Sequence, residues 1–168
     1  KLAEALAIAD IVVVALPVMQ GIGRVGCFLA GCCWGRPSDS FGVAFPERSL
    51  AYQALLRTSD ADVVDRMRAA HETLPLLPVQ LIETAFDLVL FVALLVILHR
   101  KRFHGAVLVA YGLLYGALWV VFQALRDDPE LRFGAVSLSQ LIAASFVVAS
   151  IAAWAALRTR RSVAVTPV

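Results

Sequence analysis

Apolar residues of this chain fall into four long runs, and most charged residues lie between the runs or at their ends. The runs cover Leu2–Ile22, Leu77–Leu98, Gly105–Leu125 and Val136–Leu157. Each has the length that an α-helix needs to cross the hydrocarbon core of a bilayer, about 20 residues. The pattern predicts an all-α integral membrane protein with about four transmembrane helices and, between the first two, one external insertion.

The insertion has a different pattern from the spans. Residues 37–77 carry charged side chains at short intervals and contain no apolar run long enough to cross a membrane. Weak amphipathic patterns predict short helices over Leu50–Arg57 and Ala61–Ala70, and Ser59–Asp60 provides an N-cap candidate for the second. We therefore expect four parts. These are 1–36 with the first helix and a glycine-rich segment, 37–77 as the extracytoplasmic insertion, 78–161 with three transmembrane helices, and 162–168 as a cytoplasmic tail.

Composition and charge support this class and give it an orientation. Hydrophobic residues make up 60% of the chain and charged residues 17%, and the net charge of +2 gives no reason to expect a nucleic-acid partner. Basic residues cluster at 99–104 and 158–161, and the positive-inside rule places both clusters and the C-terminus in the cytoplasm. The insertion and the loop 126–135 are then outside. Residue 1 is Lys and no signal peptide is visible, so we expect an N-terminal part to precede it.

The segment Gly21–Pro37 is the most unusual stretch, with five glycines, three cysteines and two arginines in GIGRVGCFLAGCCWGRP. It either continues the first helix or forms a re-entrant segment. Arginine at membrane depth usually faces a polar cavity or a bound anion. Arg24 and Arg36 could hold a phosphate or carboxylate through their planar forks, with nearby glycine N–H groups completing an anion site. A structural ion pair between Arg24 and Glu83 is the alternative, and helix packing is the alternative role for Gly31 and Gly35.

Polar residues of the other spans are expected in the same outer half of the membrane, which indicates a site there. Snorkelling near helix ends is the alternative, and it is favoured for Arg126 alone. They are Gln80, Glu83, Asp87, Gln123, Arg126, Ser139 and Gln140. Asp10 lies in the first run, where it either faces a cavity or pairs with a neighbouring helix.

The three cysteines follow a Cys-x4-Cys-Cys spacing with no histidine close in sequence. Zinc sites favour Cys-x2-Cys pairs or nearby histidines, and a nucleophilic cysteine needs a base or a lowered pKa. We therefore expect Cys27, Cys32 and Cys33 to be small packing residues, with no metal bound.

Several segments, in the same order, resemble bacterial prolipoprotein diacylglyceryl transferases. Gly23–Arg36 resembles the signature segment of that family, Phe41–Pro46 the segment that follows it, and Pro78–Glu83 its His-Pro-(Ser/Thr)-Gln-Leu-Tyr-Glu motif. Tyr111–Arg126 and Ser137–Ile142 resemble parts of its later spans. The resemblance implies a transferase of the bacterial inner membrane that uses no cofactor. Such enzymes move a diacylglyceryl group from phosphatidylglycerol to the cysteine thiol of a prolipoprotein signal peptide, and glycerol phosphate leaves.

The resemblance also implies roles for individual residues. Arg24 would hold the phosphate, and Arg24, Glu83 and Tyr115 are the candidates for catalysis. The remaining substrate-binding candidates are Gly23, Gly26, Gly31, Gly35, Arg36, Gln80, Gln123 and Arg126.

The chain departs from the family pattern at several positions. Cys27 and Cys32 replace an Asn and a Glu of the signature segment, and Leu77 replaces a His. Trp119 and Gln123 replace an Arg and a Glu, and the family's His-Gly-Gly loop is expected before residue 1. These changes leave two alternatives. One is a non-catalytic phospholipid-binding homologue, and the other is a small transporter subunit that uses Asp10, Glu83 and Asp87 as ion ligands.

Overall fold

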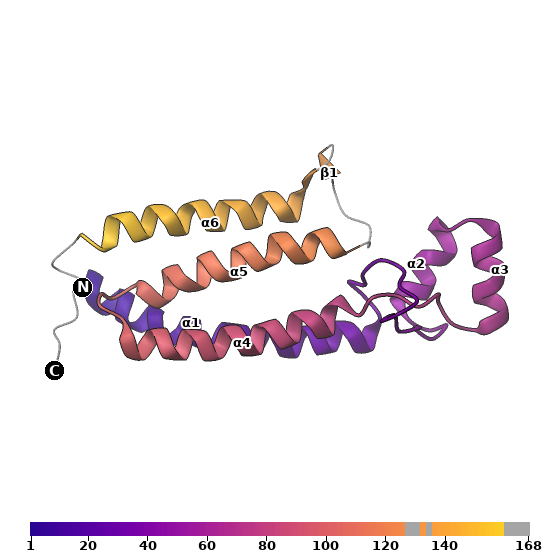
Figure 1. The fold of residues 1–168 in the computed structure, drawn as a ribbon, viewed down its shortest axis with the longest axis horizontal. Helices are drawn as coiled ribbons and strands as arrows, with labels where there is room; N and C mark the ends of the chain where they lie inside the picture. The colour runs from indigo at the N-terminus through magenta and orange to yellow at the C-terminus, as the bar shows by residue number, and fades with distance from the viewer. Residues whose placement is uncertain (127–131, 134–135, 160–168) are drawn as a thin grey trace. The chain divides into compact units, whose positions relative to one another are not determined.

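The computed structural model describes residues 1–126, 132–133 and 136–159, and it is mainly helical (Figure 1). Its elements are α1 (Leu2–Ala30), α2 (Leu50–Thr58), α3 (Ala61–Ala70), α4 (Val79–Arg100), α5 (Ala106–Leu125), β1 (Arg132–Phe133), β2 (Val136–Ser137) and α6 (Leu138–Leu157). Four of these helices, α1, α4, α5 and α6, are long and apolar enough to cross a membrane. The predicted class, an all-α integral membrane protein, is confirmed.

The predicted spans agree with the observed helices except at the end of the first. α4, α5 and α6 begin within two residues of the predicted positions. α1 is longer than its apolar run, because it continues through Pro17 and the first glycines to Ala30. The glycine-rich segment is thus helical in its first half and irregular after Ala30, and it is not a separate re-entrant element.

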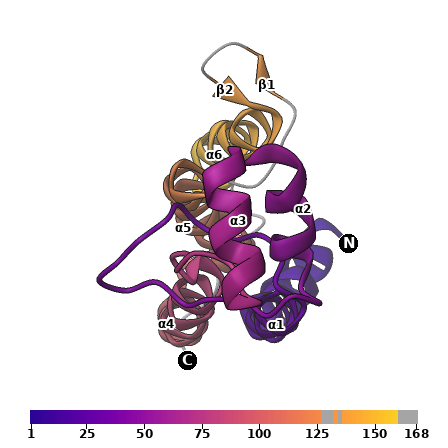
Figure 2. The same cartoon turned by 90° about the vertical axis from the view of Figure 1, so that its right-hand side faces the viewer.

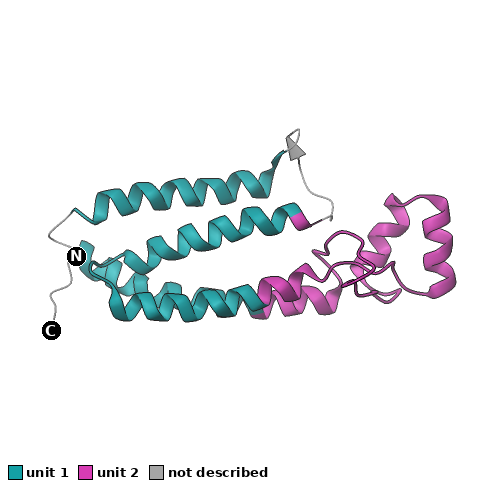
Figure 3. Ribbon diagram, viewed as in Figure 1, with its two compact units in different colours: residues 1–21, 85–124, 130–168 teal, residues 22–84, 125–129 magenta. Residues whose placement is uncertain are grey.

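The chain forms two compact units (Figure 3). Residues 1–21, 85–124 and 130–168 form the first, and residues 22–84 and 125–129 form the second. The core of the first unit contains Val13 and Val14 of α1, Leu90 and Leu94 of α4, and Val107 of α5. Gly116 of α5 lies against Val147 of α6, so the absence of a side chain at Gly116 allows these two helices to approach closely.

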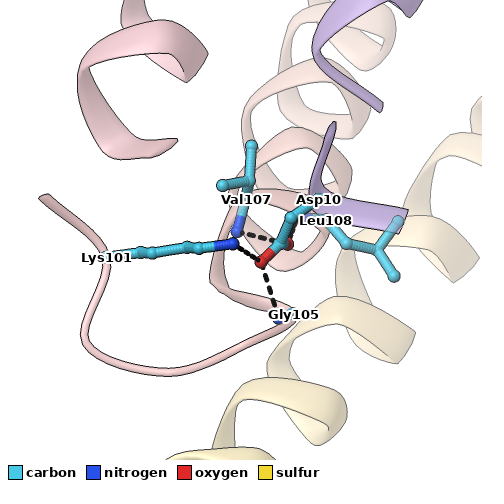
Figure 4. Close-up of polar contacts among 5 residues, drawn as sticks. All are labelled: Asp10, Lys101, Gly105, Val107 and Leu108. Atoms are coloured by element: carbon cyan, nitrogen blue, oxygen red, sulfur yellow. Dashed lines mark hydrogen bonds and ion pairs between the residues drawn. The ribbon is translucent and has the colours of Figure 1, made fainter. Parts of the chain in front are cut away.

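Asp10 fixes the turn between α4 and α5 within the first unit (Figure 4). Its carboxylate is fully buried and accepts hydrogen bonds from Lys101 Nζ and the Gly105 N–H, each 2.8 Å away. The N–H groups of Val107 and Leu108 donate to it over 3.0 and 3.1 Å. Val107 and Leu108 are the second and third residues of α5, and an N-cap side chain normally accepts a hydrogen bond from the N–H groups at these positions. A residue of α1 therefore caps α5, which decides between the two roles considered for Asp10 in favour of a structural partner.

The second unit contains the insertion, closed by isolated backbone bridges that join Pro37 and Val43 to Leu76 and Pro46 to Glu72. Trp34, Phe45, Ala51 and Leu76 form its buried apolar cluster. α2 and α3 lie against each other in this unit (Figure 2). Ser49 caps α2 by accepting from the Tyr52 N–H, whereas Asp60 holds the N-cap position of α3 without a side-chain bond. Both predicted insertion helices are confirmed.

The predicted loop 126–135 is described only in part. Within it, β1 pairs with β2 in an antiparallel hairpin that the apolar pattern did not predict. Residues 127–131 and 134–135, and the whole predicted tail 162–168, lie outside the described residues.

Candidate functional site at the end of the first helix

Arg24 of α1 and Glu83 of α4 form an ion pair in the second unit. Arg24 Nε lies 2.6 Å from Glu83 Oε2, and the arginine side chain is 20% exposed while the carboxylate is 5% exposed. The two atoms are close enough for an ion pair, but the Nε–H group of Arg24 is not directed at Glu83 Oε2 and does not form a hydrogen bond with it. No other hydrogen bond or ion pair of Arg24 is found in the part of the chain that the structure describes. The two terminal nitrogens of its fork thus have no described polar partner.

The position of this pair along its helices places it just inside a span end. Arg24 stands six residues, or ~9 Å, before the end of α1 at Ala30. Glu83 stands four residues, or ~6 Å, after the start of α4 at Val79. Both charges thus lie within about two turns of the end of a helix that is long and apolar enough to cross a membrane.

α1 ends in a left-handed turn that folds the chain back over its last helical turn. The Gly31 N–H donates to the Phe28 carbonyl over 3.1 Å, and the Cys32 N–H donates to the Cys27 carbonyl over 3.0 Å. With Gly31 at φ +67°, these bonds define a Schellman motif. A Cβ on Gly31 would lie 2.6 Å from the Ser49 Cβ, so a glycine is needed here for both conformation and space.

Gln80 ties α4 to this turn. It is fully buried, and its Nε2 donates to the Cys32 carbonyl oxygen. Its Oε1 is buried without a partner among the described residues. Gln80 and Glu83 are three residues apart on α4 and thus lie on one face of that helix. This face holds the end of α1 at two points, which fits the positioning role that the family resemblance implies for both residues.

The turn brings the three cysteine thiols together, which the spacing argument had not predicted. The sulfurs of Cys27, Cys32 and Cys33 all lie within 4.8 Å of one another, the residues are partly buried, and no disulfide joins them. The glycine in the pattern Cys-x3-Gly-Cys could have predicted this cluster. When the glycine ends the helix in a Schellman motif, the turn brings the cysteine four residues before it into contact with the cysteine that follows it. The prediction that these cysteines are small packing residues therefore did not anticipate that their sulfurs lie together.

The thiol of Cys32 is protonated at neutral pH in the absence of a ligand. Cys32 lies two residues beyond α1, and burial raises its pKa to about 12. A hydrogen bond between the Cys32 and Cys27 side chains adds to this shift. The Cys32 Sγ also donates to the Cys27 carbonyl oxygen, 3.6 Å away. A thiol in this state is a poor nucleophile at neutral pH. The cluster is thus not a reactive-cysteine site on its own.

The glycines of the segment divide into two kinds. Gly23 and Gly26 have open space where a Cβ would stand, so no protein contact requires them to be small. Gly35 is tightly enclosed, with a Cβ 2.5 Å from Val79 Cγ2, and its N–H donates to the Leu77 carbonyl. Because Gly31 ends α1 and Gly35 lies beyond it, the alternative of a helix-packing pair at these two positions is wrong.

The other predicted site residues are divided between the two units. The Arg36 side chain is exposed, and its backbone N–H donates to the Leu125 carbonyl. Arg126 forms an isolated bridge with Gly35 in the same unit. Gln123 and Tyr115 belong to the first unit, where Gln123 is buried and Tyr115 stacks on Tyr111 with ring centroids 5.2 Å apart.

Trp119 extends that aromatic row. Its ring centroid lies 5.9 Å from that of Tyr115 and 6.4 Å from that of Phe146 on α6. At the position where the family pattern has an arginine, this chain therefore has an aromatic contact between α5 and α6. The replacement converts a charged position into part of the apolar packing.

Four candidate membrane-spanning helices, an arginine paired with a carboxylate and a cysteine-rich turn at the end of one span together define a polytopic helical membrane protein. A family model described as prolipoprotein diacylglyceryl transferase matches residues 1–156. The chain belongs to the prolipoprotein diacylglyceryl transferase family, as its motifs had indicated.

Curated relatives carry the same name. The chain is 32% identical over 147 residues to phosphatidylglycerol–prolipoprotein diacylglyceryl transferase 2 of Clostridium perfringens, covering 87% of this chain and 50% of the relative. Matches to the transferases of Clostridium tetani and Serratia proteamaculans are each 30% identical, covering 88% and 86% of this chain and 52% and 51% of the relatives. The chain thus spans about half the length of the curated relatives it matches.

Proposed function

We propose that the protein transfers a diacylglyceryl group from phosphatidylglycerol to the cysteine thiol of a prolipoprotein signal peptide, at the outer face of the bacterial inner membrane. The observation that carries this proposal is the ion pair between Arg24, which lies in the family signature segment, and Glu83, which lies in the second family motif Pro78–Glu83. A cation held by a carboxylate, with two nitrogens of its fork without a described protein partner, suits a lipid phosphate.

The reaction follows from that binding mode. The acceptor thiol releases its proton to water, and its sulfur attacks the carbon of the diacylglyceryl group that carries the phosphate. A C–S bond forms, and the C–O bond to the phosphate breaks. Glycerol phosphate leaves with an additional negative charge. Arg24, held at a fixed position, would stabilise that charge as it develops, which is the kind of interaction that lowers a transition-state barrier most.

Glu83 acts as a positioning residue in this proposal. Its carboxylate contacts Nε of Arg24, so it would hold the guanidinium in place while the other two nitrogens of the fork bind the phosphate. A guanidinium anchored in this way loses less conformational entropy on binding a phosphate than a free side chain would.

The transporter alternative receives less support from the same contacts. Its candidate ion ligands Asp10 and Glu83 already serve protein partners, because Asp10 accepts four hydrogen bonds and Glu83 contacts Arg24. An ion pathway would need these carboxylates to exchange partners at each transport step.

The activity can be tested directly with the purified protein in vesicles that contain phosphatidylglycerol. A lipoprotein signal peptide with its cysteine is added, and mass spectrometry detects a diacylglyceryl adduct on that cysteine. We expect the adduct. Lipid binding without any adduct would contradict transfer and support the non-catalytic phospholipid-binding homologue.

The role of Arg24 requires a variant that does not leave a buried carboxylate unpaired. The double variant Arg24→Ala/Glu83→Gln removes the cation and neutralises its partner. We expect phosphatidylglycerol binding to weaken at least about tenfold, because charge-assisted hydrogen bonds to the phosphate are lost. Arg57→Ala removes one exposed arginine of the insertion and is the matched control. Equal binding by the double variant and the control would assign the Arg24–Glu83 pair a purely structural role.

A further inference from the structure

The thiol cluster is not explained by the phosphate site. Its three sulfurs come from the last turn of α1 and the two residues after Gly31, and Cys33 adopts a left-handed conformation at φ +59°. Non-glycine residues adopt this conformation only where their surroundings hold them in it. Small packing residues would not need three adjacent sulfurs.

The distances between the sulfurs are close to those of a common metal ion. A Zn–S bond is about 2.3 Å, so two sulfurs on one tetrahedral zinc ion are about 3.8 Å apart. The three sulfurs here lie within 4.8 Å of one another, which is at most about 1 Å wider than the spacing on a shared ion. The ion would displace the thiol protons, because zinc binds thiolates.

The number of ligands indicates the kind of site. No fourth His, Cys, Asp or Glu joins the three cysteines among the described residues. All three are only partly buried, and the neighbouring Gly26 has open space beside it. Structural zinc sites have four protein ligands, whereas catalytic sites have three and keep one position open. We propose that Cys27, Cys32 and Cys33 bind one Zn²⁺ ion and leave its fourth position open for an incoming thiol.

The open position would serve the transfer reaction, and this step rests on the proposed function. A thiol that coordinates zinc is deprotonated, with its proton released to water. The acceptor cysteine could thus reach the lipid as a metal-held thiolate. Its sulfur then forms the C–S bond as glycerol phosphate leaves, and the charges balance without a further proton transfer. Arg24 and Cys27 are three residues apart on α1, so the phosphate-binding cation and the metal lie on one helix face.

The first measurement is metal content. The intact protein is purified without a histidine tag, and zinc is measured by elemental mass spectrometry. We expect one Zn²⁺ per chain, lost in Cys27→Ser and in Cys32→Ser. The variant His71→Ala/His99→Ala removes two exposed histidines and should keep the metal. Metal-free protein, or zinc retained in both cysteine variants, overturns the proposal. So does a mass lower by two hydrogens with the thiols paired in a disulfide, or bound copper in place of zinc.

The second measurement tests the open position without using activity. Co²⁺ replaces Zn²⁺, and its sulfur-to-metal charge-transfer absorption is recorded as a cysteine-containing signal peptide is added. We expect the band to strengthen with the cysteine peptide and to stay unchanged with the same peptide carrying serine. An unchanged spectrum with the cysteine peptide would show that no thiol binds the metal. Because neither readout needs turnover, failure here and failure of the transferase assay are separate results.

Discussion

Asp10 and Glu83 are both buried carboxylates with a basic partner, but the setting of each pair differs. Asp10 is 0% exposed and receives four donors on its two oxygens, so nothing is left for a ligand. Glu83 contacts an arginine that is itself 20% exposed and holds it by a single nitrogen. The saturated group therefore stabilises the fold, and the partly open pair is suited to binding.

Replacing Asp10 tests this structural role. Asp10→Ala removes the cap of α5 and leaves Lys101, which is 13% exposed, without its ion partner. Breaking a buried pair from one side usually lowers the free energy of unfolding by about 3 kcal/mol. We expect a clear drop in the thermal unfolding midpoint in detergent. Glu4→Ala, which removes an exposed carboxylate beside the N-terminus of the same helix, should leave the midpoint unchanged. Similar midpoints for the two variants would contradict the capping role.

At the scale of single helices, the apolar pattern predicted where the spans lie but not how the first one ends. Hydropathy registers the composition of a run, so it placed α4, α5 and α6 within two residues at their starts. The end of α1 depends instead on backbone conformation at one glycine, Gly31. The thiol cluster was not predicted for the same reason. The cysteine spacing was compared with zinc motifs, and that comparison does not take into account a turn that reverses the chain between the cysteines.

The contact between α5 and α6 can be tested at Gly116. A Cβ there would lie 2.8 Å from Val147 Cγ2 and 3.2 Å from the Ala143 carbonyl oxygen. We expect Gly116→Ala to lower the free energy of unfolding by ~1–3 kcal/mol, as overpacking does. Val147→Ala should recover part of that loss in the double variant, measured by thermal unfolding in detergent. The same substitution at Gly26, where there is space for a Cβ, is the control and should cause no loss. A Gly116→Ala variant as stable as Gly26→Ala would argue against close packing at this position.

At the scale of the whole molecule, the sequence predicted the class, the spans and the insertion, because these depend on long stretches of residues. It left open whether Arg24 pairs with Glu83 and what Asp10 contacts, because those pairings join residues of different helices. Hydropathy ranks residues by burial and carries no information on which buried group meets which. The structure supplied the partners.

The orientation of the molecule in the membrane remains a prediction from its charges. The positive-inside rule places the cluster 99–104 in the cytoplasm and the insertion outside. We expect an alkaline phosphatase fusion after His71 to be active and one after Arg102 to be inactive, with a cytoplasm-dependent fluorescent reporter giving the opposite result at each site. The reverse pattern would place the Arg24 site at the inner surface and would contradict transfer at the outer face.

The cap that Asp10 provides has a consequence for the biosynthesis of the protein. Its four donors lie 91 to 98 residues later in the chain. While the ribosome makes that stretch, α1 carries a carboxylate with none of these donors yet available. Because an unpaired carboxylate is costly in lipid, we expect α1 to stay next to the translocon, or near water, until the start of α5 emerges. We therefore expect α1 to enter the lipid with its partners only after the start of α5 has been made.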